Sequence, residues 1–162
     1  MTTISETYNK MLTDGTNDAE RVGWGSVDSQ AKRFRVLSEI GNLDNDSVLD
    51  VGCGLGAYFD YIHNVYPNLS YAGVDINLNM IQGAQQRHSN IEFIHTDIVA
   101  DTHALNDRKF DYVFLSGALN LSVDGHHDTI ESIMKEMFAL ANKGVAANFL
   151  SIFSDYLTPG EY

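Results

Sequence analysis

The sequence alternates short apolar runs with longer stretches in which apolar residues recur at helical spacing. Five short runs rich in β-branched and aromatic residues are typical of strands, at residues 47–51, 69–76, 91–95, 110–115 and 145–153. Helical spacing occupies residues 28–40, 58–66, 77–87 and 128–142. A strand followed by a helix and another strand pairs in parallel through a right-handed crossover. We therefore predict an α/β fold, in which helices cover both faces of a doubly wound, mainly parallel sheet of five strands.

Residues with special backbone preferences locate the predicted ends of the helices. Asp28 or Ser29 fits the N-cap of the first helix, and Gly41 fits the left-handed position after its end. Lys143 and Gly144 are expected to end the last helix, before the fifth strand. These signals set the expected boundaries of the elements.

The chain of 162 residues has the length of one domain with a substantial core. Residues 1–27 are polar and glycine-containing, so we expect a partly ordered arm or lid there. We expect residues 28–162 to form the domain itself.

The net charge of -12 is large for this length. Such a surface repels phosphate backbones, which disfavours nucleic acid as a partner. The single cysteine, Cys53, has no internal disulfide partner, and the polar residues 1–11 lack an export signal. No apolar run approaches the roughly 20 residues of a membrane span. We therefore expect a cytoplasmic protein without membrane contact.

A glycine-rich segment follows the first predicted strand. Gly52, Gly54 and Gly56 alternate there, so that a ligand can lie against backbone without Cβ atoms. The segment also satisfies the dinucleotide pattern G-x-G-x-x-A, and Asp75 follows Gly52 by roughly 20 residues, where a ribose-binding acid belongs. A nicotinamide or flavin site is therefore an alternative at this point.

Asp50 bears on that alternative, because it lies inside the first strand, just before the glycines. A carboxylate beneath the loop repels the pyrophosphate that a dinucleotide would place there. A ligand that brings an ammonium and a sulfonium, and no phosphate, is attracted instead. The sign of this charge favours S-adenosylmethionine.

The segment Asp50 to Gly56 resembles the D-x-G-x-G-x-G signature of class I S-adenosylmethionine-dependent methyltransferases. The resemblance continues through residues 73–76, 96–98 and 110–113, and so spans roughly residues 46–120 in the family's order. It implies a Rossmann-like fold, S-adenosylmethionine as the cofactor and S-adenosylhomocysteine as its product. It also implies methyl transfer to an acceptor that the sequence does not identify.

The same resemblance assigns the methionine end of the cofactor to the first strand and its loop. Asp50 and the backbone of Gly52, Cys53 and Gly54 would hold that end. Asp75 would accept hydrogen bonds from both ribose hydroxyls.

By the same resemblance, Ile76 would pack on the adenine and Asp97 would accept from its amino group. The Ile98 amide would donate to the ring. Ser116 and Gly117 would lie near the sulfonium and the transferable methyl.

Other roles remain open for some of these residues. Asp75 also suits a helix N-cap, and Asp97 also suits the closure of a polar turn. Asp111 is expected to be solvated at the far end of the sheet, and Cys53 to fill space in the loop. His126-His127 lacks further ligands at metal spacing, so we expect no metal site.

No catalytic residue is named, because displacement at a sulfonium methyl mainly requires an aligned nucleophile. The walls of the acceptor pocket are guessed from position to be Tyr8, Arg21, Trp24, Ser116 and Asn120. The chain lacks an N-P-P-[YF]-like stretch after the fourth strand. Together with the acidic charge, this favours a small-molecule or protein acceptor.

The family's sheet carries two further strands, an antiparallel hairpin, after the fifth. The sequence given ends at Tyr162, soon after the fifth predicted strand, so we expect either that the chain is a fragment or that this hairpin is absent. An open edge at the fifth strand would favour a homodimer. The short C-terminus supports one alternative, a non-catalytic cofactor-binding domain, and the G-x-G-x-x-A match supports another, an NAD(P)-dependent oxidoreductase.

Overall fold

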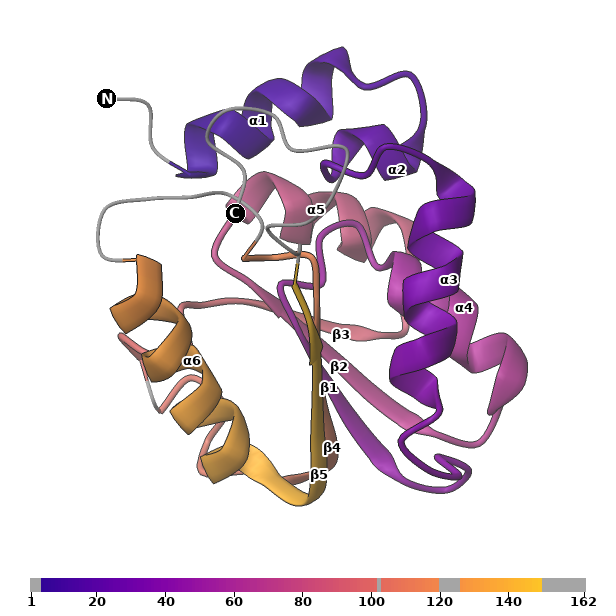
Figure 1. Ribbon diagram of the computed structural model, residues 1–162, viewed down its shortest axis with the longest axis vertical. Helices are drawn as coiled ribbons and strands as arrows, with labels where there is room; N and C mark the ends of the chain where they lie inside the picture. The colour runs from indigo at the N-terminus through magenta and orange to yellow at the C-terminus, as the bar shows by residue number, and fades with distance from the viewer. Residues whose placement is uncertain (1–3, 102, 120–125, 150–162) are drawn as a thin grey trace.

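The computed structural model describes residues 4–101, 103–119 and 126–149. Five strands form one sheet in the order β3-β2-β1-β4-β5, and every neighbouring pair is parallel (Figure 1). The strands are β1 (Ser47–Val51), β2 (Ser70–Asp75), β3 (Glu92–His95), β4 (Phe110–Ser116) and β5 (Ala141–Asn148). The chain passes from β3 at one edge to β4 on the far side of β1, so the strand order reverses between β1 and β4. This confirms the predicted doubly wound α/β fold.

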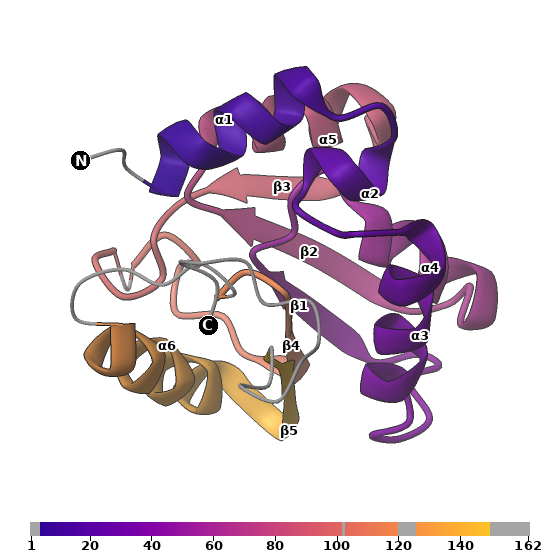
Figure 2. The ribbon, with the colours of Figure 1, turned by 45° about the horizontal axis from the view of Figure 1, so that its top comes forward.

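Helices cover both faces of the sheet (Figures 1 and 2). The helices on one face are α3 (Val27–Ser38), α4 (Ala57–Val65) and α5 (Leu78–Arg87), and α6 (His126–Leu140) covers the other. Two further helices, α1 (Ile4–Asp14) and α2 (Asp18–Arg21), lie near α5 at the end of the sheet where the strands finish. No described helix has the length and apolar content that crossing a membrane would require.

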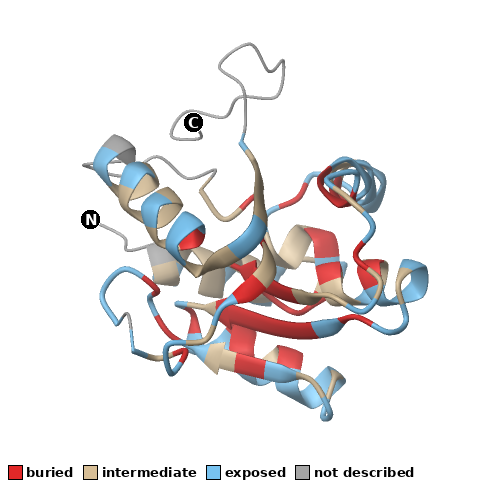
Figure 3. Cartoon of the chain, turned by 90° about the horizontal axis from the view of Figure 1, so that it is seen from below, coloured by how far each residue is buried: buried red, intermediate tan, exposed pale blue. Residues whose placement is uncertain are grey.

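The core consists of two apolar layers, because successive side chains of a strand point to opposite faces. On β1, Val48 packs into the layer beneath α3 and α4, whereas Leu49 packs into the layer beneath α6. Tyr58 and Phe114 belong to the first layer and Met137 to the second, and all three are fully buried. Figure 3 shows the resulting band of buried residues along the central strands. This layering leaves the carboxyl ends of the strands free to build a site.

The boundaries of α3 differ from the expectation. Its N-cap is Ser26, whose hydroxyl accepts from the Ser29 N–H, and not Asp28 or Ser29. Gly41 does not adopt a left-handed conformation. Its lack of a Cβ serves packing instead, because a Cβ there would lie 2.8 Å from the Tyr112 hydroxyl oxygen.

The junction between α6 and β5 also differs. The helix ends at Leu140, where Lys109 donates to the Ala139 carbonyl, and β5 begins at the next residue. Lys143 and Gly144 therefore lie inside the strand and do not end the helix. The Lys143 ammonium forms ion pairs with Asp46, just before β1, and with Asp111 of β4, so contacts with distant residues fix this segment. The predicted end of this strand, at 150–153, lies outside the described residues.

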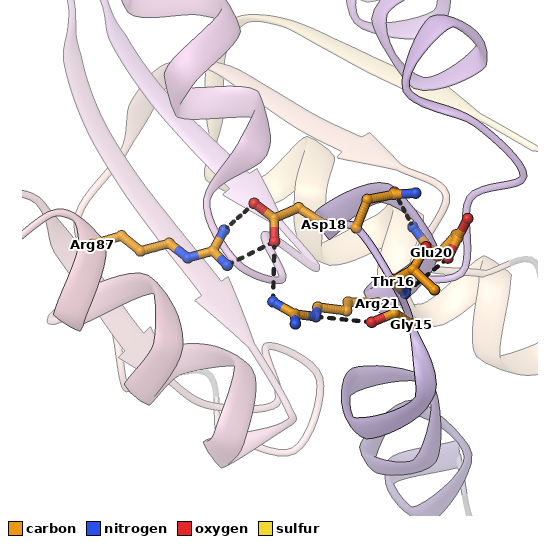
Figure 4. A network of polar contacts seen from close by, with 7 residues as sticks. Gly15, Thr16, Asp18, Glu20, Arg21 and Arg87 are labelled. Atoms are coloured by element: carbon orange, nitrogen blue, oxygen red, sulfur yellow. Dashed lines mark hydrogen bonds and ion pairs between the residues drawn. The ribbon is translucent and has the colours of Figure 1, made fainter.

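The segment 1–27 was expected to be a partly ordered arm, and residues 4–14 and 18–21 in it are helical. Side-chain bonds attach these helices to α5. Arg87 donates two hydrogen bonds of 2.8 Å to the two carboxylate oxygens of Asp18, which also faces Arg21 (Figure 4). The Asn77 amide donates to Asn9 over 3.0 Å. Contacts with a distant helix, which local composition does not reveal, hold this segment in place.

Candidate functional site

The carboxyl ends of β1, β2 and β4 border a cavity of about 490 Å³, at the point where the strand order reverses. Its lining includes all nine residues that the sequence analysis assigned to a cofactor: Asp50, Gly52, Cys53, Gly54, Asp75, Ile76, Asp97, Ile98 and Ser116. Tyr8 and Trp24, two of the guessed acceptor walls, also line it, whereas Arg21 does not. Asn120 lies outside the described residues.

The glycine loop between β1 and α4 has a conformation that other residues adopt only with strain. Gly52, Gly54 and Gly56 have φ angles of 72°, 53° and 85°. The N–H groups of Gly52 and Cys53 both donate to the Val74 carbonyl, over 2.8 and 3.0 Å. A Cβ on Gly52 would lie 2.3 Å from the Ala118 Cβ. The loop is thus fixed against β2 and the segment after β4, with bare backbone facing the cavity.

Asp50 is an acid buried beneath this loop, with 2% of its surface exposed. The Tyr71 hydroxyl donates to Asp50 Oδ2 over 2.6 Å. Burial raises the pKa of Asp50 to about 7, Tyr71 opposes the rise, and the charge of Asp75 adds to it. A cationic group in the cavity would favour the ionised form.

Asp75 joins the glycine loop to the start of α5. One of its carboxylate oxygens accepts from the Gly54 N–H over 2.9 Å, and the other accepts from the Asn77 N–H over 2.8 Å. Burial raises its pKa, and these bonds to backbone N–H groups oppose the rise. The N-cap of α5 is Asn77, which accepts from the N–H groups of Asn79 and Met80. Asp75 therefore does not serve as that cap.

Asp97 follows β3 and closes a turn, which is one of the two roles expected for it. Its Oδ1 accepts from the N–H groups of Val99 and Ala100, over 2.9 and 3.2 Å. The neighbouring Ile98 is 6% exposed and Ile76 is 49% exposed, and both border the cavity. Together they provide an apolar surface beside an exposed carboxylate.

Asn148, at the end of β5, forms hydrogen bonds with Ser116, the last residue of β4, and with Gly117, which follows it. The Gly117 N–H donates to Asn148 Oδ1 over 3.1 Å, and the Asn148 Nδ2 group donates to Ser116 Oγ over 3.1 Å. A backbone N–H can only donate, which fixes the orientation of this amide. Ser116 therefore accepts from Asn148 and keeps its own proton.

The N-terminal segment closes the cavity on the side of the glycine loop. Trp24 lies against Gly117, where a Cβ would come within 2.5 Å of its ring, and Val22 lies within 3.1 Å of a Cβ on Gly54. Gln30 of α3 also lines the cavity. The sequence analysis named neither Gln30 nor Asn148, because no motif marks them and their positions depend on contacts between distant segments.

The described residues that line the cavity include four aspartates, Asp50, Asp75, Asp97 and Asp128, and no lysine, arginine or histidine. Such a lining repels the pyrophosphate of a dinucleotide and attracts a cation. The described residues include no group of three His, Cys, Asp or Glu side chains placed to hold a metal ion.

Asp111 lies at the opposite, amino end of the sheet. It was expected to be solvated, but its carboxylate accepts from both the N–H and the hydroxyl of Ser47, at 2.9 Å each. These bonds hold its pKa below the usual range. Asp111 thus joins the starts of β1 and β4, away from the cavity.

Comparison with known proteins identifies relatives in sequence. A family model described as "Methyltransferase domain" matches residues 48–144. A putative methyltransferase of Mycobacterium tuberculosis is 31% identical over 120 residues, which cover 69% of this chain and 68% of that protein. A putative methyltransferase of Invertebrate iridescent virus 6 is 31% identical over 117 residues, and the match spans only 42% of its length.

Solved structures resemble the fold. Magnesium protoporphyrin IX methyltransferase from Synechocystis PCC 6803, with bound SAM, has a TM-score of 0.64 at 20% identity. The match covers 93% of this chain and 73% of that one. PKMT2 from Rickettsia typhi, in complex with AdoHcy, has a TM-score of 0.54 at 24% identity and covers 70% of this chain and 23% of its own.

The matched residues include the glycine loop, Asp75 and Asp97, which the fold brings to one cavity. The chain belongs to the family of class I S-adenosylmethionine-dependent methyltransferases.

Proposed function

We propose that this chain binds S-adenosylmethionine in the cavity and transfers its methyl group to a small-molecule or protein acceptor. The observation that carries the proposal is the meeting of the glycine loop, Asp75 and Asp97 in one cavity with an acidic lining. The cavity volume of about 490 Å³ lies within the range of small-molecule sites.

The methionine end of the cofactor would lie over Asp50 and the glycine loop. Asp50 is buried and ionises reluctantly, so a ligand ammonium or sulfonium would be its counter-charge. Gly52 and Gly54 line the cavity, so their backbone lies within reach of that end.

The adenosine end would lie at the ends of β2 and β3. Asp75 already accepts two backbone N–H bonds, and an ionised carboxylate has lone pairs for two further hydroxyl donors. The adenine would lie between Ile76 and Ile98, next to the carboxylate of Asp97. Each contact fits a group that the described residues present to the cavity.

Bound S-adenosylmethionine supplies an activated methyl group on a sulfonium. The residues of the chain hold the nucleophile in line with this methyl and exclude water. Ser116 and Trp24 line the cavity beside the loop after β4 and are placed for this task. No general base is required if the acceptor arrives unprotonated.

The names of the relatives support a small-molecule or protein acceptor. They include a phosphoethanolamine N-methyltransferase, a trans-aconitate 2-methyltransferase and a malonyl-[acyl-carrier protein] O-methyltransferase. One relative is named for ribosomal RNA, and the net charge of -12 argues against that class of acceptor here. The chain spans 68% of the mycobacterial relative but only 42% and 43% of the next two, so their activities enter only as support.

Calorimetric titration with S-adenosylhomocysteine tests the proposal, with NADH as a parallel ligand. We expect micromolar binding of the first and none of the second. Asp75→Asn removes the charge that would hold the ribose, and we expect it to weaken binding at least about tenfold. Asp107→Asn, an exposed acid away from the cavity, is the matched control and should bind as the wild type does. If folded wild-type protein does not bind S-adenosylhomocysteine, the proposal is overturned.

A further inference from the structure

The cavity lacks positively charged side chains of the lysine and arginine type. The sequence contains ten such residues, and all ten lie within the part of the chain that the structure describes. None of them lines the cavity, whereas four aspartates do. The rest of the chain holds no further lysine or arginine that could complete this lining. A ligand with a carboxylate or a phosphate would therefore meet negative charge here without a lysine or arginine to compensate it.

Most of these cations have partners elsewhere. Six of them form ion pairs with acids that do not line the cavity: Arg21, Arg35, Arg87, Arg108, Lys135 and Lys143. Lys109 donates to the Ala139 carbonyl. The guanidinium carbon of Arg33 lies 4.8 Å from the ring centroid of Trp24, but only Trp24 lines the cavity. The charge of the lining is thus dominated by its acids.

S-adenosylmethionine would compensate only part of this negative charge. Its ammonium and sulfonium are positive and its carboxylate is negative, which leaves a single net positive charge. The acids assigned to the cofactor are Asp50 of β1, Asp75 of β2 and Asp97, which follows β3. The fourth aspartate, Asp128, lies on α6 and has no partner in the cofactor. It is therefore available to an acceptor.

The start of α6 presents polar groups to the cavity. Asp128, Thr129, Ser132 and Ile133 all line it. Residues four positions apart on a helix are neighbours on its surface, so Asp128 lies beside Ser132 and Thr129 beside Ile133. Asp128 is exposed, and no ion pair among the described residues includes it. This part of the lining combines one carboxylate with hydroxyl groups.

Asp128 also changes the charge at the N-terminus of α6. The N-terminus of a helix carries a partial positive charge that attracts anions. Asp128 lies in the first turn of α6, which begins at His126, and its carboxylate compensates that charge. The helix end therefore does not replace the missing cations as a site for a carboxylate or a phosphate.

We propose that the methyl acceptor is an amine, bound as its ammonium with the carboxylate of Asp128 as the counter-charge. The proposal rests on the proposed function and narrows the acceptor to one chemical class. Tyr8, Trp24 and Ile133 also line the cavity and provide apolar surface for the rest of the acceptor. The acidic lining attracts an ammonium and repels acceptors that carry a carboxylate or a phosphate.

Methyl transfer to such an acceptor releases one proton. The ammonium first gives its proton to water, to which the exposed Asp128 is accessible. The nitrogen lone pair then forms the bond to the methyl carbon, and the electron pair of the breaking carbon–sulfur bond returns to sulfur. The products are the methylated ammonium and S-adenosylhomocysteine. The positive charge of the sulfonium is thereby replaced by that of the product, which Asp128 still faces.

A matched set of acceptors tests the proposal. Trideuteriomethyl S-adenosylmethionine is incubated with phenethylamine, phenethyl alcohol, phenylacetate and phenethyl phosphate, and with tryptamine, indoleacetate, hexylamine and hexanoate. A short peptide with one lysine and a blocked N-terminus represents a protein amine. Mass spectrometry locates the label. We expect it on an amine nitrogen, at about tenfold or more the rate for the matched carboxylate or phosphate.

Each outcome of this assay decides the matter. Label on the free amines identifies a small molecule as the source of the amine, and label on the peptide alone identifies a lysine side chain. Label mainly on a carboxylate, a phosphate or an alcohol, or on none of the amines while S-adenosylhomocysteine still binds, overturns the inference. Wild-type protein that does not bind S-adenosylhomocysteine overturns the proposed function instead.

Variants of Asp128 test its part in the selection. Asp128→Asn removes the charge at constant size, and we expect the KM of the amine to rise about threefold or more, with kcat and the affinity for S-adenosylhomocysteine within about twofold of the wild type. Asp128→Glu should restore the KM. Glu131→Gln, at an exposed acid of the same helix that does not line the cavity, is the matched control.

Asp128→Lys reverses the charge at the same position. We expect the ratio of kcat/KM for the amine to that for the matched carboxylate to fall about tenfold or more. If Asp128 only stabilised the start of α6, its variants would change both acceptors alike. Equal changes for amine and carboxylate would therefore contradict the assignment of Asp128.

Discussion

Asp50 shows how one residue can connect stability with binding. Its burial raises its pKa to about 7, so the folded protein binds a proton more tightly than the unfolded chain between roughly pH 4 and pH 7. The stability that this proton contributes is present at low pH and is lost as the pH rises through about 7. Above that pH the buried Asp50 carboxylate is ionised, and a cation bound in the cavity would compensate its negative charge.

Asp50→Asn removes this titration and keeps an oxygen that accepts from Tyr71. The unfolding free energy of the variant, relative to the wild type, should increase by about 1–3 kcal/mol between pH 5 and pH 8. Chemical denaturation at both pH values measures it. A constant difference would show that Asp50 is not the group that titrates, and the same variant should bind S-adenosylhomocysteine more weakly.

Gly52 tests the packing of the loop. Gly52→Ala places a Cβ 2.3 Å from that of Ala118 and adds strain at a φ of 72°, so we expect a loss of about 2–4 kcal/mol of stability. Ala118→Gly in the same chain should restore part of this loss, because it removes the collision but not the strain. A double-mutant cycle by denaturation measures the coupling, and purely additive losses would argue against the contact.

At the scale of elements, one residue at the start of α5 both caps that helix and attaches α1 to it. Asn77 caps the helix through its Oδ1 and holds α1 through its Nδ2, which donates to Asn9 and Ser5. The N–H of the same residue donates to Asp75. The attachment of the N-terminal helices is thus adjacent to the acid proposed to hold the ribose.

Two substitutions at Asn77 separate these duties. Asn77→Ala removes both, and we expect it to cost about 1–3 kcal/mol of stability and to speed tryptic cleavage after the exposed Lys10 of α1. Asn77→Ser retains an N-cap oxygen but is too short to reach Asn9, so stability should recover while cleavage stays fast. If Asn77→Ser protects Lys10 as well as the wild type does, the amide does not hold α1.

Sequence patterns predicted the elements best where local chemistry decides them. The β-branched runs located β1 to β4 closely, because those strands are apolar on their buried faces. They missed the start of β5 at Ala141 and the helices of residues 4–21, which depend on pairing with β4 and on bonds to α5.

The same division holds for the site. The glycine loop, Asp75 and Asp97 were predicted because each follows a strand within a recognisable motif. Gln30 and Asn148 were not predicted, since neither stands in a motif. Their positions follow from the packing of α3 and β5 beside the ends of β1 and β4.

At the scale of the whole molecule, the charge of -12 acts on any charged ligand that approaches. S-adenosylmethionine carries one more positive charge than S-adenosylhomocysteine, at the sulfonium. Salt screens this attraction, so its dissociation constant should rise about threefold or more between 20 and 500 mM NaCl, with a smaller change for S-adenosylhomocysteine. Titrations at both salt concentrations measure this, and equal changes for the two ligands would contradict a role for the net charge.

The central claim is that S-adenosylmethionine lies at the carboxyl ends of β1, β2 and β4. The most direct measurement is a crystal structure of the complex with S-adenosylhomocysteine. The account predicts the ribose hydroxyls on Asp75, the adenine between Ile76 and Ile98, and the amino-acid end over Asp50 and the glycine loop. Density for the ligand at another place on the molecule, with this cavity empty, would contradict it.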